Sequence, residues 1–137
     1  MTIQKENVRN FWAAQAKKSN LGNEGISNLE EDKNLLEKKI NLEQEKIMPF
    51  IKQHFDENSK VLDLGSGTGQ WAFRFSPLVK SVSLVEFSKE MMELAENNSK
   101  GKYNNLNFFL SEAQDFLINE FFDLIWISGL LIYLTDS

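Results

Sequence analysis

The stretch Lys60–Gly69, read as K-V-L-D-L-G-S-G-T-G, decides the fold of the chain around it. Its apolar residues Val61, Leu62 and Leu64 predict a short buried strand, and three glycines follow that strand at once. Glycine has no Cβ, so positive φ angles cost little and a ligand can approach the main chain closely. A buried strand that runs into a glycine-dense turn therefore predicts a place where the backbone meets a ligand.

The composition of the 137 residues excludes several classes of protein. No apolar run approaches the length of a membrane span, and the N-terminus lacks the apolar segment of a signal peptide, so we expect a cytoplasmic protein without membrane contact. The absence of cysteine removes disulfides, thiolate metal sites and cysteine nucleophiles. With one histidine, His54, we expect no metal site. A net charge of −5 without a basic stripe argues against binding to nucleic acid.

Strand and helix patterns alternate along the second part of the chain. Predicted strands begin at Val61 and cover Ser81–Phe87, Leu106–Leu110 and Phe121–Ser128; predicted helices cover Gln70–Phe75, Lys89–Asn98 and Gln114–Asn119. This alternation favours a parallel sheet built from right-handed crossovers. In such sheets ligands bind beyond the carboxyl ends of the strands, where the glycine turn also lies.

The first part of the chain is predicted to be helical. We expect one helix over Glu6–Lys18 and a second, mostly helical stretch over Asn28–Phe55, with a break or kink at Pro49. Between them, Ser19–Ser27 has the glycines and capping residues of a loop. We therefore divide the chain into an N-terminal helical segment, 1–56, and a core, 57–137.

The aromatic pair Phe11 and Trp12 allows two interpretations of the first helix. Both residues fall on its apolar face, which predicts a helix docked on the body of the protein. The alternative is a lid in which Phe11 or Trp12 covers a ligand.

The glycine spacing discriminates between nucleotide-binding motifs. A dinucleotide fingerprint is G-x-G-x-x-G, whereas this chain has G-x-G-x-G followed by Gln70, and the Gly-Lys-Ser/Thr of a Walker loop is absent. Glu86 ends the second predicted strand, 21 residues after Gly65. A carboxylate at that position can accept hydrogen bonds from both hydroxyls of a ribose.

Four segments of the chain closely resemble the class I S-adenosylmethionine-dependent methyltransferases. They are V-L-D-L-G-S-G-T-G at 61–69, L-V-E-F at 84–87, S-E-A-Q-D-F at 111–116 and F-D-L-I-W-I-S-G-L-L-I-Y-L at 122–134. The resemblance implies S-adenosyl-L-methionine as cofactor and an α/β, Rossmann-like three-layer sandwich with a mostly parallel sheet, preceded by N-terminal helices. The predicted strands supply the order 3-2-1-4 of that fold, and the family's C-terminal strands are missing.

The resemblance also implies roles for individual residues. The glycine turn would cradle the methionine part of the cofactor through the residues Gly65, Ser66, Gly67 and Gly69. Asp63 would orient the polar end of that part, and Glu86 would hold the ribose.

The remaining implied roles concern the adenine and the sulfonium. Phe87 would lie against the adenine, with Met91 as a weaker candidate. Glu112 and Ala113 would meet the adenine edge, with Glu112 accepting a hydrogen bond from its amino group. Ser128 would line the pocket near the sulfonium through its carbonyl. For Asp123 a site role and a structural role stay open.

The acceptor half of the site is expected to be incomplete. The segment I-S-G-L-L at 127–131 lacks the Asp/Asn-Pro-Pro-aromatic stretch of DNA amino-methyltransferases, and without cysteine the chain cannot attack C5 of cytosine. We therefore expect an oxygen or nitrogen atom of a small molecule as methyl acceptor, and we assign no catalytic acid–base pair. The alternatives are a fragment of a longer protein, a chain completed by self-association or by a partner over the edge of strand four, and a non-catalytic cofactor-binding module.

Overall fold

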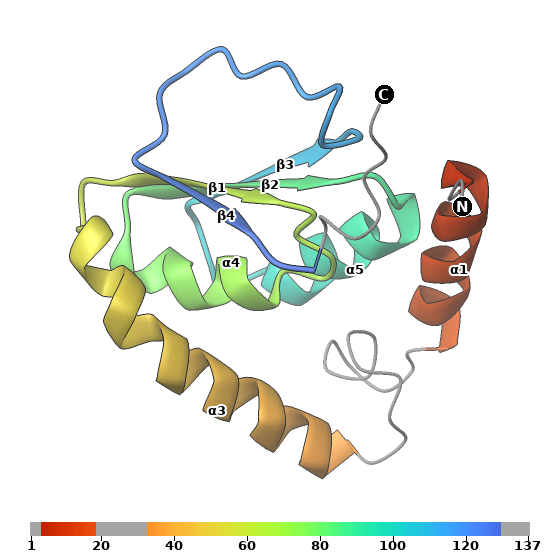
Figure 1. The fold of residues 1–137 in the computed structure, drawn as a ribbon, viewed down its shortest axis with the longest axis horizontal. Helices are drawn as coiled ribbons and strands as arrows, with labels where there is room; N and C mark the ends of the chain where they lie inside the picture. The colour runs from red at the N-terminus through yellow and green to blue at the C-terminus, as the bar shows by residue number, and fades with distance from the viewer. Residues whose placement is uncertain (1–3, 19–32, 130–137) are drawn as a thin grey trace.

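The computed structural model describes residues 4–18 and 33–129 (Figure 1). The helices are α1 (Lys5–Lys18), α3 (Lys33–Ile51), α4 (Gln70–Phe75) and α5 (Lys89–Ser99), with 3-10 turns at Lys52–His54 and Ser76–Leu78. The strands are β1 (Lys60–Leu64), β2 (Ser81–Glu86), β3 (Leu106–Leu110) and β4 (Leu124–Ile127). The predicted loop Ser19–Ser27 and the start of the second predicted helix at Asn28 lie outside the described residues.

The four strands form one parallel sheet in the order β3-β2-β1-β4, which confirms the predicted order. The register places Leu64 of β1 beside Val85 of β2 and Ile127 of β4. Leu110, the last residue of β3, lies beside Glu86. All four carboxyl ends therefore meet at one edge of the sheet, as the alternation of strands and helices predicted.

The core lies between the sheet and the helices α3, α4 and α5, which cover the same face of it (Figure 1). Its buried members are Met48, Val61, Trp71, Ala72, Phe75, Val79, Val82, Leu84 and Ala95. Alternate strand residues point to this face because the side-chain period of a strand is two. The arrangement is the predicted Rossmann-like α/β fold. In the described part of the chain α3 packs into this core together with residues after position 56, and the division into the segments 1–56 and 57–137 stays a prediction.

The opposite face of the sheet carries the irregular segment between β3 and β4, and the helix predicted at Gln114–Asn119 is wrong. One turn forms there, where the N–H groups of Asp115 and Phe116 donate to the carbonyl of Glu112. Phe116 packs against Phe109 of β3, but Leu117 is 85% and Ile118 52% exposed, so the stretch buries little apolar surface. A single helical turn is costly to nucleate without such packing.

Of the break or kink predicted at Pro49, the break is wrong, because α3 continues through Pro49 to Ile51, and the kink stays a prediction. Pro49 lies in the last turn of the helix, where its missing N–H removes one hydrogen bond, to the carbonyl of Glu45, and only two helical residues follow it. Met48 is buried and both Ile47 and Ile51 pack against the core, so tertiary packing holds the helix through the proline.

Strand β4 is shorter than predicted, and Asp123 precedes it in a structural role. The N–H of Asp123 donates to the Lys60 carbonyl at 2.9 Å, and its Oδ2 accepts from the Lys60 N–H at 2.8 Å. This reciprocal pair fixes β4 against the start of β1, at the edge opposite the glycine turn. Phe121 is 97% exposed and lies before the ladder, so the predicted start of the strand is wrong.

Candidate functional site

The glycine turn follows β1 and is held to the end of β2. Gly65, Gly67 and Gly69 all have positive φ angles, of 72°, 58° and 91°. The N–H groups of Gly65 and Ser66 both donate to the carbonyl of Val85, at 2.8 and 3.1 Å. These bonds place the turn across the carboxyl edge of two neighbouring strands, as the predicted cofactor site requires.

Two of these glycines differ in what surrounds them. A Cβ on Gly69 would lie 2.8 Å from the ring of Phe73, so close packing against α4 excludes a side chain there. A Cβ on Gly67 would meet nothing within 4 Å, so open space adjoins the main chain at that position. The turn at Gly67 can therefore be approached closely by a ligand.

Asp63 is buried beneath the turn, on the sheet face covered by α4. It accepts a hydrogen bond from the backbone N–H of Ala72, and its Oδ2 has no partner. Burial, and secondarily the nearby charge of Glu86, raise the pKa of Asp63 to about 7. The hydroxyl of Ser66 is buried without a partner as well. Since buried polar atoms are normally paired, Asp63 and Ser66 each offer a hydrogen-bonding position to a bound molecule or to an ordered water.

Glu86 closes the turn through its carboxylate. Its Oε2 accepts the N–H of Gly67 at 2.9 Å, and its Oε1 accepts the N–H groups of Phe87 and Ser88, each at 2.9 Å. Burial raises its pKa, and the three N–H groups oppose that rise. Because a carboxylate offers about four acceptor positions, Oε2 retains one for a ribose hydroxyl.

The adenine-side residues Phe87 and Glu112 lie at the ends of β2 and β3. The Glu112 carboxylate accepts from Lys5 Nζ at 2.8 Å and from Arg9 Nη2 at 3.1 Å, both on α1. The Arg9 guanidinium lies over the Phe87 ring, 5.6 Å from its centroid. The structure thus brings α1 onto the predicted adenine subsite.

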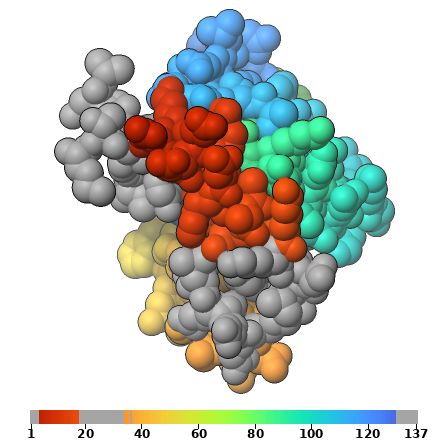
Figure 2. All heavy atoms as spheres, turned by 90° about the vertical axis from the view of Figure 1, so that its right-hand side faces the viewer, coloured from red at the N-terminus to blue at the C-terminus, as the bar shows by residue number. Residues whose placement is uncertain are grey.

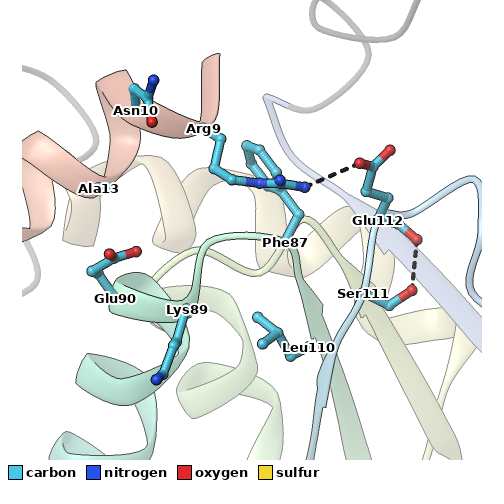
Figure 3. A pocket seen from close by; sticks show the side chains of 9 residues that line it. All are labelled: Arg9, Asn10, Ala13, Phe87, Lys89, Glu90, Leu110, Ser111 and Glu112. Carbon is cyan, nitrogen blue, oxygen red and sulfur yellow. Dashed lines mark hydrogen bonds and ion pairs between the residues drawn. The ribbon is translucent and has the colours of Figure 1, made fainter. Parts of the chain in front are cut away.

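A cavity of about 410 Å³ opens between α1 and these strand ends (Figure 3). Its volume falls within the range of small-molecule sites, roughly 300–1,000 Å³. Nine residues line it: Arg9, Asn10, Ala13, Phe87, Lys89, Glu90, Leu110, Ser111 and Glu112. The three residues from α1 and the two that begin α5 were not predicted, because no local motif marks a contact made across the sequence.

The packing interpretation of α1 is confirmed for Trp12. Trp12 packs with Ala16 of α1 against Met91 and Leu94 of α5. Phe11 is 41% exposed and lies edge-on to Trp12. Figure 2 shows α1 lying over the part of the surface formed by α5 and the strands. Arg9 of α1 lies over Phe87, a predicted cofactor residue, and this contact was not predicted. Met91, the weaker candidate for the adenine, packs against α1.

The last two predicted residues lie near the same edge. Ala113 is half-buried on the turn after β3, and Ser128 is exposed directly after β4. Open space beside Gly67, unpartnered buried oxygens on Asp63 and Ser66 and a free acceptor position on Glu86 together fit a bound nucleoside that carries a polar tail. The residues present are therefore compatible with the cofactor that the resemblance implies.

Comparison with protein families and solved structures agrees with this geometry. A family model described as a methyltransferase domain matches residues 61–137. Comparison with curated protein sequences gave no match. In the described part of the chain, no helix is both long and apolar enough to span a bilayer, and the cytoplasmic location stays a prediction.

Three solved structures illustrate the similarity of fold. An S-adenosylmethionine-dependent methyltransferase from Leishmania major is 23% identical over 95% of this chain, with a TM-score of 0.72. Phosphoethanolamine N-methyltransferase 1 from Haemonchus contortus, solved with phosphoethanolamine and S-adenosylhomocysteine, is 20% identical over 98%, with a TM-score of 0.69. A dimethyladenosine transferase from Plasmodium falciparum is 25% identical over 61%, with a TM-score of 0.55.

This chain spans 50%, 28% and 30% of the lengths of those three proteins. The family match covers more than half of this chain and includes the glycine turn and the Glu86 strand end. The chain therefore belongs to the methyltransferase domain family, within the class I S-adenosylmethionine-dependent methyltransferases, whose cofactor is S-adenosylmethionine.

Proposed function

We propose that this chain binds S-adenosylmethionine and transfers its methyl group to an oxygen or nitrogen atom of a small molecule. The observation that carries the proposal is the glycine turn, which Glu86 holds through the N–H of Gly67, together with the buried oxygen atoms of Asp63 and Ser66 that have no protein partner. The open position at Gly67 and the spare acceptor position on Glu86 suit a ribose and a polar tail on the same ligand.

The chain's own residues would bind and orient rather than exchange protons. The cofactor, when bound, supplies a methyl carbon that is already activated for displacement. Asp63, the glycine turn and Glu86 would hold the donor, and Phe87 and Glu112 would contact its base. Alignment of donor and acceptor can contribute roughly 7–11 kcal/mol to the lowering of the barrier. A general base is required only for an acceptor that must lose a proton, and no side chain is assigned that role.

The acceptor class is inferred from charge and sequence. The chain is acidic overall and lacks the Asp/Asn-Pro-Pro-aromatic segment after strand four, both of which favour a small molecule over a nucleic acid. A dimethyladenosine transferase shares the fold, so RNA is the competing acceptor that an experiment must include.

The cofactor assignment is tested by calorimetric titration with S-adenosylhomocysteine. Glu86→Ala removes the hydrogen bond expected to a ribose hydroxyl, and we expect the binding free energy to weaken by about 1–3 kcal/mol. Glu96→Ala, on the exposed side of α5, serves as the matched control. Equal affinity in the parent and Glu86→Ala, with both folded by circular dichroism, contradicts the ribose assignment.

The acceptor is tested separately with methyl-labelled S-adenosylmethionine. We expect label in a pool of small metabolites and none in total RNA. Label in RNA alone replaces the small-molecule proposal. Cofactor binding without transfer to either pool indicates a binding module.

A further inference from the structure

Glu112, the predicted partner of the adenine amino group, is held by two cations of α1. Lys5 Nζ lies 2.8 Å from its Oε2, and Arg9 Nη2 lies 3.1 Å from its Oε1. Both carboxylate oxygens are therefore engaged by side chains more than 100 residues away in sequence. Gln114 Nε2 adds a contact of 3.3 Å to Oε2.

Arg9 also covers the aromatic surface expected for the base. Its guanidinium lies over the ring of Phe87, in a cation–π arrangement 5.6 Å from the centroid (Figure 3). The guanidinium is planar and carries N–H donors at its edge, as adenine does on its amino side. It thus combines the two contacts expected of adenine, stacking on Phe87 and donation to Glu112.

The two ends of α1 are held differently. Towards its C-terminal end, Trp12 and Ala16 are packed on Met91 and Leu94 of α5. Towards its N-terminal end, the side chains of Lys5 and Arg9 are 51% and 49% exposed. Exposed ion pairs contribute little each, so the first turns of the helix can release while its apolar anchor stays in place.

We propose that α1 is an intramolecular competitor of the cofactor's adenine, with Arg9 in the place of the base on Phe87 and Glu112. The proposal rests on the proposed function. Entry of adenine breaks the contacts of Arg9 and releases the first turns of α1, so the helix sets the cofactor affinity. If Arg9 were instead a fixed wall of the site, its removal would weaken cofactor binding, so the two roles predict opposite signs.

The experiment is a titration with S-adenosylhomocysteine of the parent chain, Arg9→Ala and Lys5→Ala. We expect Arg9→Ala to bind roughly three- to tenfold more tightly, and Lys5→Ala to bind more tightly by a smaller factor. Lys17→Ala removes an exposed cation of the same helix outside the cavity and should leave the affinity unchanged. An unchanged or weakened affinity in Arg9→Ala overturns the proposal.

Hydrogen exchange of the α1 amides separates this proposal from the cofactor assignment. In the ligand-free protein, we expect faster exchange over residues 5–10 in Arg9→Ala and Lys5→Ala than in the parent. In the parent, S-adenosylhomocysteine should accelerate the same amides. If no variant binds S-adenosylhomocysteine, the cofactor assignment fails, and competition by α1 fails with it. If the ligand binds but slows these amides, α1 closes over the cofactor and the competition is refuted.

Discussion

Asp63 is the residue at which burial and charge act most strongly. Its carboxyl group is fully buried, one oxygen has no partner, and Glu86 lies close enough to raise its pKa further. The ionised form of Asp63 is therefore unfavourable in the ligand-free protein. Carboxyl groups with perturbed pKa values are concentrated at functional sites.

The raised pKa of Asp63 predicts a pH dependence of stability. The unfolded chain loses this proton near pH 4 and the folded chain near pH 7, so between these values the folded state binds more protons. The free energy of unfolding should therefore fall as the pH rises from 4 to 7, by up to about 4 kcal/mol from this group.

Asp63→Asn isolates this contribution. We expect the variant to be more stable than the parent at pH 8 and the difference to shrink as the pH falls to 4. Urea denaturation across this pH range measures it. A difference between parent and variant that stays constant with pH contradicts the assignment.

At the residue scale, the sequence predicts which residues gather at the carboxyl edge of β1 and β2, and their roles toward the cofactor stay predictions. The glycine spacing and the Glu86 strand end are local patterns, and the parallel sheet brings them together. Arg9 and Lys5 could not be predicted, because their partner Glu112 is more than 100 residues away and long-range ion pairs leave no local pattern. That Glu86 accepts the N–H of Gly67 was likewise not evident from spacing alone.

Among the elements, α1 and α4 differ in how they are anchored. α4 contributes Trp71, Ala72 and Phe75 to the main core, whereas α1 contacts the body through the smaller Ala16–Met91 cluster. Helices with few buried apolar contacts open at lower free energy than the rest of the molecule.

This difference in anchoring predicts that substitutions of Trp12 and Trp71 affect the free energy of unfolding differently. Trp12→Ala should speed hydrogen exchange in α1 and change the free energy of global unfolding only slightly. Trp71→Ala, in the main core, should lower that free energy by about 3–5 kcal/mol. Exchange mass spectrometry and denaturant unfolding of both variants measure this. If both variants lose the same free energy of global unfolding, the proposed difference between α1 and α4 is wrong.

The elements that were predicted wrongly share a cause. The predictions for Pro49 and Gln114–Asn119 came from the local sequence pattern, but tertiary packing determines the structure at both places. The core holds α3 through its proline, whereas the segment after β3 packs against the sheet only loosely and leaves Leu117 and Ile118 exposed. Ser88 illustrates the opposite case, because a capping side chain acts locally. Its Oγ accepts the N–H of Met91, and α5 begins at Lys89, where the helix was predicted to begin.

At the scale of the whole molecule, large apolar side chains remain exposed away from the helical layer. They come from β3, β4 and the segment between them: Phe109, Leu117, Ile118, Phe121, Ile125 and Ile127. In the described sheet β4 is an edge strand. Edge strands and exposed apolar surface both promote association.

We therefore expect this 137-residue chain to self-associate as its concentration rises. Phe121→Ser should weaken the association, because Phe121 is 97% exposed between β3 and β4. Phe50→Ser, on α3 and 73% exposed, is the matched control and should leave it unchanged. Sedimentation velocity measures both. A parent chain that stays monomeric at all concentrations contradicts this expectation.

The reciprocal pair between Lys60 and Asp123 also bears on the order of folding. β1 meets β2 after a short stretch of chain, but the pair with Asp123 closes a loop of 63 residues. Each doubling of loop length adds about 0.6 kcal/mol of closure entropy, and non-local pairings form slowly. β4 should therefore join last, onto a nucleus of β1, β2 and α4 that is already formed. Asp123→Ala should then accelerate unfolding and leave the folding rate nearly unchanged, and a slowed folding rate would place β4 in the nucleus.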